Sequence, residues 1–173
     1  MPRTRVDTSA EIRAVATELF ARQGFEKTSL REVAEQLGIT KAALYYHFPS
    51  KVDLVRGIVQ PLLDDVEALL AEAAEGDPQG FLADYFDVVL RHRQVFELVI
   101  RDVGALAQLD LMEQMLGWRE RTYRLLVGEG ATPAQIAKAT VAIGGLQDCA
   151  LTEGSVEDFR EAALGAAIAA LRS

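Results

Sequence analysis

Apolar residues recur along almost the whole chain at intervals of three and four, the spacing that places them on one side of an α-helix. The first such stripe is Ile12, Val15, Ala16, Leu19 and Phe20, and no segment shows the sustained alternation of a β-strand. We therefore expect an all-α protein of about nine helices. The expected helices cover about residues 8–23, 29–37, 40–48, 51–74, 78–92, 94–106, 110–127, 133–151 and 156–172.

Short signals mark the ends of several of these helices. Thr8, Ser29 and Thr132 are each followed three residues later by Glu or Gln, which is the capping-box arrangement at a helix start. Gly24 can take the left-handed conformation that ends a helix. Pro61 lies inside the fourth helix, so we expect a kink there.

The second and third helices are short and joined by a tight turn, the arrangement of a helix-turn-helix. Gly38 supplies the left-handed conformation in the turn, and Thr40 caps the third helix. Leu44 and Phe48 are four residues apart on one face of the third helix, and we expect that face to pack on the first helix. The opposite face is free to contact DNA.

The side chains of the third helix suit DNA recognition. Lys41 lies in its first turn, where recognition helices meet base edges, and can donate to guanine. Alanines can approach a thymine methyl group, tyrosine and histidine can donate to phosphates, and the helix starts at Ser29 and Lys51 favour anions. Arg3 and Arg5 form either a solvated tail or an arm that enters the minor groove. The candidate DNA-binding residues are Ser29, Thr40, Lys41, Ala42, Ala43, Tyr45, Tyr46, His47 and Lys51.

The run from Thr28 to Lys51, TSLREVAEQLGITKAALYYHFPSK, resembles the TetR family of repressors. Residues 19–25, LFARQGF, resemble the end of that family's first helix, and the match covers about the first third of the chain. One departure is Ala42, where family members often carry Gly. The C-terminal two thirds are similar only in helical layout.

The resemblance implies an all-helical homodimer that represses transcription from a near-palindromic operator and leaves it when a small molecule binds the C-terminal domain. It implies base contacts by Lys41, Ala42 and Ala43. It implies phosphate contacts by Ser29, Tyr45, Tyr46, His47 and Lys51. We expect a DNA-binding domain at residues 1–50 and a regulatory and dimerisation domain at residues 51–173.

Charge divides the chain in the same way. Residues 1–55 carry eight Lys and Arg against seven Asp and Glu, which is a net charge of +1. Because the whole chain has a net charge of −8, residues 56–173 carry −9. A near-neutral head on an acidic body fits a module that touches DNA at one end and has weak non-specific affinity. A structural DNA organiser would need a basic chain.

The sequence lacks the signals of membrane proteins and of enzymes. No apolar run reaches the roughly 20 residues that span a bilayer and no signal-peptide core follows the N-terminus, so we expect a cytoplasmic protein with no membrane partner. Cys149, the single cysteine, is either a small buried hydrophobe or a redox site. No catalytic motif, phosphate loop or set of metal ligands is present, so we expect no enzyme, no cofactor and no metal site.

The C-terminal domain offers a candidate pocket and a candidate interface. The candidate ligand-binding residues are Tyr85, Phe86, Val89, His92, Phe96, Val99, Met112, Met115, Trp118, Tyr123 and Gln147, each of which could instead fill the core. Nineteen acidic residues in this region favour a neutral or cationic hydrophobic ligand over an anion. Helices 133–151 and 156–172 are rich in Ala and Gly and form either an internal pair or a symmetric dimer interface. A regulator that responds to a protein partner, or to no ligand, is the alternative.

Overall fold

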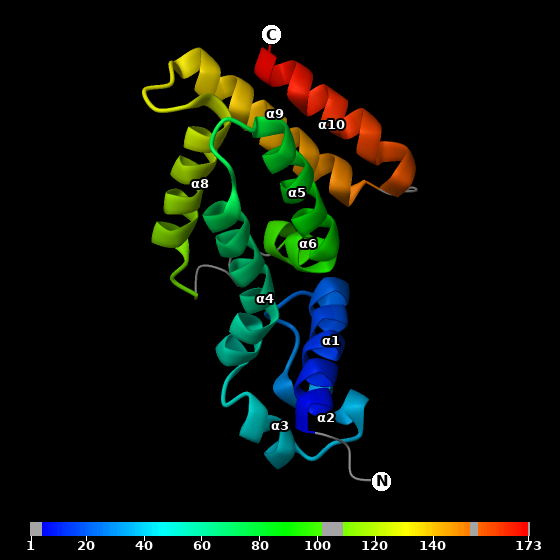
Figure 1. The fold of residues 1–173 in the computed structure, drawn as a ribbon. Coiled ribbons are helices and arrows are strands. Elements are labelled where there is room, and N and C mark those ends of the chain that lie inside the picture. Colours follow the sequence, from blue (N-terminus) through cyan, green and yellow to red (C-terminus); the bar gives the residue numbers. More distant parts are fainter. Residues whose placement is uncertain (1–4, 102–108, 153–155, 173) are drawn as a thin grey trace. The chain divides into compact units, whose positions relative to one another are not determined.

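The computed structural model describes residues 5–101, 109–152 and 156–172, with side chains described for 8–98, 109–152 and 159–172. These residues form nine helices and no strand, which confirms the all-α prediction (Figure 1). The helices are α1 (Arg5–Gln23), α2 (Leu30–Leu37), α3 (Lys41–His47), α4 (Lys51–Glu72), α5 (Pro78–Arg91), α6 (Arg93–Arg101), α8 (Met112–Val127), α9 (Pro133–Leu151) and α10 (Val156–Arg172).

The helices group into two compact units. Among the described residues, the N-terminal unit contains 5–61, 94–101 and 109–111, and the C-terminal unit contains 62–93, 112–152 and 156–172. α4 belongs to both units and stays helical through Pro61, the last residue of its N-terminal part. The expected kink at Pro61 and the domain limits drawn from the sequence stay predictions.

In the N-terminal unit the predicted helix ends of α2 and α3 are confirmed. The Ser29 hydroxyl accepts from the Glu32 N–H, and the Glu32 carboxylate accepts from the Ser29 N–H at 2.7 Å, which completes the capping box. Gly38 ends α2 with a φ of 64°, in the left-handed region. The Thr40 hydroxyl accepts from the Ala43 N–H at 3.1 Å and starts α3.

The predicted start of the first helix is wrong. α1 begins at Arg5, so Thr8 lies inside the helix and is not its N-cap. A capping box is a local pattern that can also occur within a helix, because Thr and Glu are tolerated there. The predicted apolar stripe is confirmed: Ile12 and Ala16 are fully buried, and Phe20 lies 5.6 Å from the ring of Phe25.

In the C-terminal unit α9 and α10 form the most extensive helix pair, and α5 packs against both. Leu82, Phe86 and Val89 of α5 are buried, as is Leu146 of α9. The predicted capping box at the start of α9 is confirmed, because the Thr132 N–H donates to Gln135 Oε1 at 2.9 Å. No helix within the described parts of the chain combines the length and apolar character needed to cross a membrane.

Ion pairs tie the helices of this unit together. Asp65 of α4 accepts from His92 at 2.8 Å and from Arg91 at 2.7 Å, and these hydrogen bonds hold the pKa of the Asp65 carboxyl below its usual range. Arg160 of α10 makes a two-pronged ion pair with Asp87 of α5. The dimer-candidate helix α10 is therefore joined to α5 by a polar contact as well as by packing.

Candidate DNA-binding interface

The third helix of the N-terminal unit presents one side to solvent and one to the core. Leu44 is its single buried residue and is fully buried, while Tyr46, two positions on, is 68% exposed. At 100° per residue, Ala42 and Tyr46 lie opposite Leu44, with Ala43 and Tyr45 beside them. The face predicted to read DNA is therefore the solvent-facing side of α3.

The cationic and aromatic groups of α3 form two close pairs. The Lys41 ammonium lies 5.3 Å from the centre of the Tyr45 ring, within the range of a cation–π contact. The rings of Tyr46 and His47 meet edge to face with their centres 5.4 Å apart. Three groups that can donate to phosphates or base edges, Lys41, Tyr45 and Tyr46, are thus all exposed on α3.

Two other predicted contact residues are engaged inside the unit. The Lys51 ammonium lies 4.0 Å over the ring of Phe25 and donates to the Glu26 carbonyl at 3.3 Å. The Ser29 hydroxyl donates to the Glu32 carboxylate at 2.9 Å, and hydrogen bonds from the Ser29 N–H, the Ser29 hydroxyl and Gln23 lower the pKa of that carboxyl. A phosphate near Ser29 would have to compete with an ionised Glu32. The side chains of Arg3 and Arg5 lie outside the described residues.

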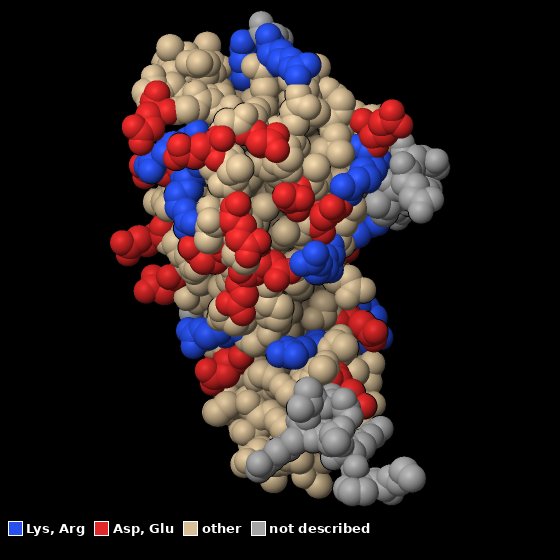
Figure 2. Space-filling view, viewed as in Figure 1, with Lys and Arg blue, Asp and Glu red and all other residues tan. Residues whose placement is uncertain are grey.

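The surface charge follows the division seen in the sequence. In the view of Figure 2, Asp and Glu crowd the surface of the C-terminal unit, and charged side chains of either sign are sparser on the N-terminal unit. Since residues 1–55 carry a net charge of only +1, charge attraction alone would give this part of the chain little affinity for DNA.

The predicted ligand-binding residues are mostly engaged with one another or with the protein. Gln147 of α9 donates to the hydroxyl of Tyr85 on α5, and burial raises the pKa of Tyr85 to about 12. Phe86 and Val89 are buried in the core, and His92 is bonded to Asp65. The Tyr85 hydroxyl consequently stays protonated and stays a hydrogen-bonding group at neutral pH.

The remaining members of that set are less enclosed. Met112 and Met115 at the start of α8 are 69% and 46% exposed. Trp118 donates to Glu67 at 2.7 Å, and the Tyr123 hydroxyl lies 2.7 Å from that of Thr140. Phe96 of α6 is half-buried, and the side chain of Val99 lies outside the described residues.

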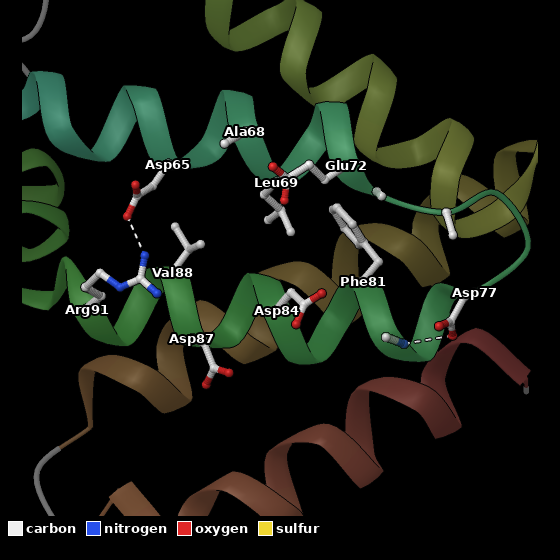
Figure 3. Close-up of a pocket in the computed structure, with 13 residues that line it drawn as sticks. Asp65, Ala68, Leu69, Glu72, Asp77, Phe81, Asp84, Asp87, Val88 and Arg91 are labelled. Carbon is white, nitrogen blue, oxygen red and sulfur yellow. Dashed lines mark hydrogen bonds and ion pairs between the residues drawn. The ribbon is translucent and has the colours of Figure 1, made fainter.

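A groove of about 520 Å³ runs between α4 and α5 on the C-terminal unit, and none of the predicted ligand-binding residues lines it (Figure 3). Phe81 and Leu69 point into the space between the two helices, and carboxylates such as Asp84 flank it. Its lining residues are Asp65, Ala68, Leu69, Glu72, Ala73, Ala74, Asp77, Gly80, Phe81, Asp84, Asp87, Val88 and Arg91. Five carboxylates against one guanidinium make this groove unfavourable for an anion.

Known proteins share the helix-turn-helix sequence. Residues 12–58 match the family model for bacterial regulatory proteins, tetR family, and this range contains α2, α3 and their turn. Residues 12–58 therefore carry the N-terminal segment of the TetR family. The match extends over the first turns of α4, so the TetR-family segment ends within the N-terminal unit.

Individual TetR-family relatives give the same result. The HTH-type transcriptional regulator AcrR of Shigella flexneri is 29% identical over 118 residues, 62% of this chain and 55% of that protein. The uncharacterized HTH-type transcriptional regulator YfiR of Bacillus subtilis is 35% identical over 117 residues, 66% of this chain and 54% of that protein. The matched part of the chain thus spans about half the length of these curated relatives.

A solved structure shows the same fold as this chain. A transcriptional regulator from Aquifex aeolicus superimposes with a TM-score of 0.75 at 22% identity, covering 92% of this chain and 96% of that one. It and the relatives above are regulators, which agrees with the prediction that the chain is not an enzyme. Within the described residues no three His, Cys, Asp or Glu side chains are grouped to hold a metal ion.

The last two helices of the chain carry outward apolar stripes. Ala134, Ala137, Val141 and Gly145 follow one exposed line of α9, and Val141 is 64% exposed. Phe159, Ala162, Ala166 and Ala169 follow a similar line on α10. A Cβ built on Gly144, Gly145 or Gly165 would meet nothing within 4 Å, so another helix has room to approach. Cys149, in contrast, is half-buried within α9 and forms no disulfide.

Sequence reasoning missed several residues that shape the N-terminal unit. Thr28 is 2% exposed, donates to the Gly24 carbonyl and accepts from Gln23, which fixes the turn between α1 and α2. Gly57 lies against Phe48, where a side chain would not fit. The sequence signal for the contact between Gly57 and Phe48 was a glycine within a helical pattern. No sequence signal indicated that the Lys51 ammonium lies over the Phe25 ring.

Proposed function

We propose that the protein is a sequence-specific, DNA-binding transcriptional regulator that reads double-stranded DNA with α3. The observation that carries this proposal is the exposure of Lys41, Tyr45 and Tyr46 on α3, the capped second helix of the helix-turn-helix, with Lys41 in contact with the Tyr45 ring. Lys41 reads a base edge, and the tyrosines bind phosphates. The TetR-family match over residues 12–58 supports this assignment, because it covers α2, α3 and the turn between them.

We further propose that the protein acts as a homodimer on a near-palindromic operator. The exposed apolar stripes on α9 and α10, with open glycines beside them, are suited to a symmetric interface in which each chain contributes both helices. A twofold dimer presents two copies of α3, and a half-site for each is needed to bind both. Repression follows from occupancy of a site that RNA polymerase would otherwise use.

Release from DNA by a small molecule completes the proposed mechanism. A ligand changes the dimer equilibrium only by its different affinity for two arrangements, and α4 is the helix that belongs to both units. Tyr85 and Gln147 supply the buried polar pair that such a ligand would displace or extend. The groove between α4 and α5 is a separate place where a ligand could bind, and its acidic lining supports a neutral or cationic molecule there.

Variants of Lys41 and Tyr45 distinguish the reading of bases from general attraction to the DNA backbone. Replacing Lys41 with Ala is expected to lower the discrimination between an operator and a scrambled duplex, with a loss of about 1–3 kcal/mol at the base pair that it reads. Replacing Tyr45 with Ala is expected to weaken binding to all sequences by similar factors. The measurement is fluorescence anisotropy on a duplex enriched by the wild-type protein from a random pool.

Lys27→Ala is the matched control for this test. It removes the same charge from the same unit, but Lys27 lies in the exposed turn before α2 rather than on α3. We expect this variant to retain the wild-type discrimination. If Lys41→Ala discriminates as well as Lys27→Ala does, then Lys41 does not read a base.

A further inference from the structure

Gly57 is a glycine in the interior of α4, within its N-terminal part. Glycine weakens a helix interior relative to alanine, so its presence calls for a compensating contact. A Cβ built on Gly57 would lie 2.7 Å from Cε1 of Phe48, 3.5 Å from Cζ and 3.7 Å from Cδ1. A carbon atom cannot occupy a position 2.7 Å from a ring carbon, so the ring of Phe48 rests against the backbone of α4 only because this side chain is absent.

Phe48 has little room to move away. It is 7% exposed, and its backbone N–H donates to the Leu44 carbonyl at 2.9 Å, which makes it the C-cap of α3. Pro49, the next residue, restricts the backbone that follows. Leu54 and Val55 of α4 are also buried, with exposures of 0% and 1%. Displacement of the ring would therefore shift the end of α3.

The direction of α3 depends on few contacts, because the helix has only seven residues and Leu44 is its one buried member. After Leu44, the next buried side chain is Phe48, which packs against Gly57. We infer that Gly57 is a positioning residue for DNA reading: it admits the ring of Phe48 and so fixes the direction in which α3 presents Lys41 and Tyr46. This inference rests on the proposed function of α3.

The contact between Lys51 and Phe25 holds the start of α4. Lys51 Nζ lies 4.0 Å over the Phe25 ring and 3.3 Å from the Glu26 carbonyl oxygen, so α4 begins fixed to the end of α1. These contacts oppose a movement of α4 away from Phe48 that would make room for a methyl group. The strain is instead transferred to Phe48 and α3.

The test is Gly57→Ala, measured by anisotropy on a duplex enriched by the wild-type protein from a random pool and on a scrambled duplex. We expect the ratio of specific to non-specific affinity to fall about tenfold, the size of one lost base-pair contact. Non-specific affinity should change little, because no charge is altered. A purely structural defect would lower both affinities together by reducing the folded fraction. Gly117→Ala, at a glycine of α8 with nothing within 4 Å, is the control and should leave the ratio unchanged.

Phe48→Leu supplies the second arm, because a smaller side chain makes room for the added methyl group. We expect Gly57→Ala in the Phe48→Leu background to cost less than twofold in the ratio. The inference is overturned if Gly57→Ala keeps the wild-type ratio, or if Phe48→Leu fails to suppress its effect. A wild-type protein that binds both duplexes equally would instead refute the proposed function, and this inference with it.

Discussion

Val141→Glu is expected to convert the protein to a monomer and to lower its affinity for the operator about 100-fold or more. Val141 is the most exposed large apolar residue on α9, at 64%, and lies on the outward stripe of that helix. In a twofold interface a single substitution buries two carboxylates, one from each chain, and neither has a charged partner. The affinity falls because the two reading helices no longer bind as one linked unit.

Sedimentation or light scattering reports the oligomeric state, and anisotropy reports the affinity of the same sample. Leu116→Glu is the matched control, because Leu116 is 55% exposed on α8 rather than on α9 or α10. We expect this control to keep the wild-type mass and affinity. A Val141→Glu protein that remained dimeric at micromolar concentration would show that the interface lies elsewhere.

Leu44→Ala is expected to destabilise the N-terminal unit by about 2–5 kcal/mol and to abolish operator binding, because truncating a buried leucine removes apolar burial and leaves a cavity. Leu44 is fully buried and is the one residue of α3 that anchors the helix to the unit's core. The dimer should persist, since α9 and α10 belong to the C-terminal unit.

Thermal and urea unfolding measure the stability loss, and light scattering measures the surviving mass. Leu116→Ala makes the same chemical change at an exposed position and should shift stability by less than about 0.5 kcal/mol. Retained operator binding by Leu44→Ala would mean that α3 is held by contacts other than its buried face.

Features that depend on neighbouring residues could be predicted from the sequence. The caps at Ser29, Thr40 and Thr132 were correct, because each requires only a side chain and the backbone three residues later. The solvent-facing side of α3 followed from the position of Leu44 alone. The start of α1 was misplaced, because the same local pattern at Thr8 occurs inside the helix.

Features that join distant residues could not be predicted in this way. The ion pairs of Asp65 with Arg91 and of Asp87 with Arg160 join residues 26 and 73 positions apart, and no periodic pattern encodes them. Lys51 illustrates the same limit at the candidate site. Its helix-start position suggested a phosphate contact, but its ammonium lies over Phe25, which is a contact that only the folded turn creates. The sequence shows a glycine at position 57, but it does not show that this glycine packs against Phe48.

The most direct test of the central claim is the affinity of the wild-type protein for DNA across a salt series. A duplex enriched from a random pool is compared with a scrambled duplex of the same composition by fluorescence anisotropy. We expect the enriched duplex to bind about a thousandfold or more tightly than the scrambled duplex at physiological salt. The scrambled duplex should bind weakly because residues 1–55 carry a net charge of only +1. Equal affinity for the two duplexes would contradict the assignment of α3 as a sequence-reading helix.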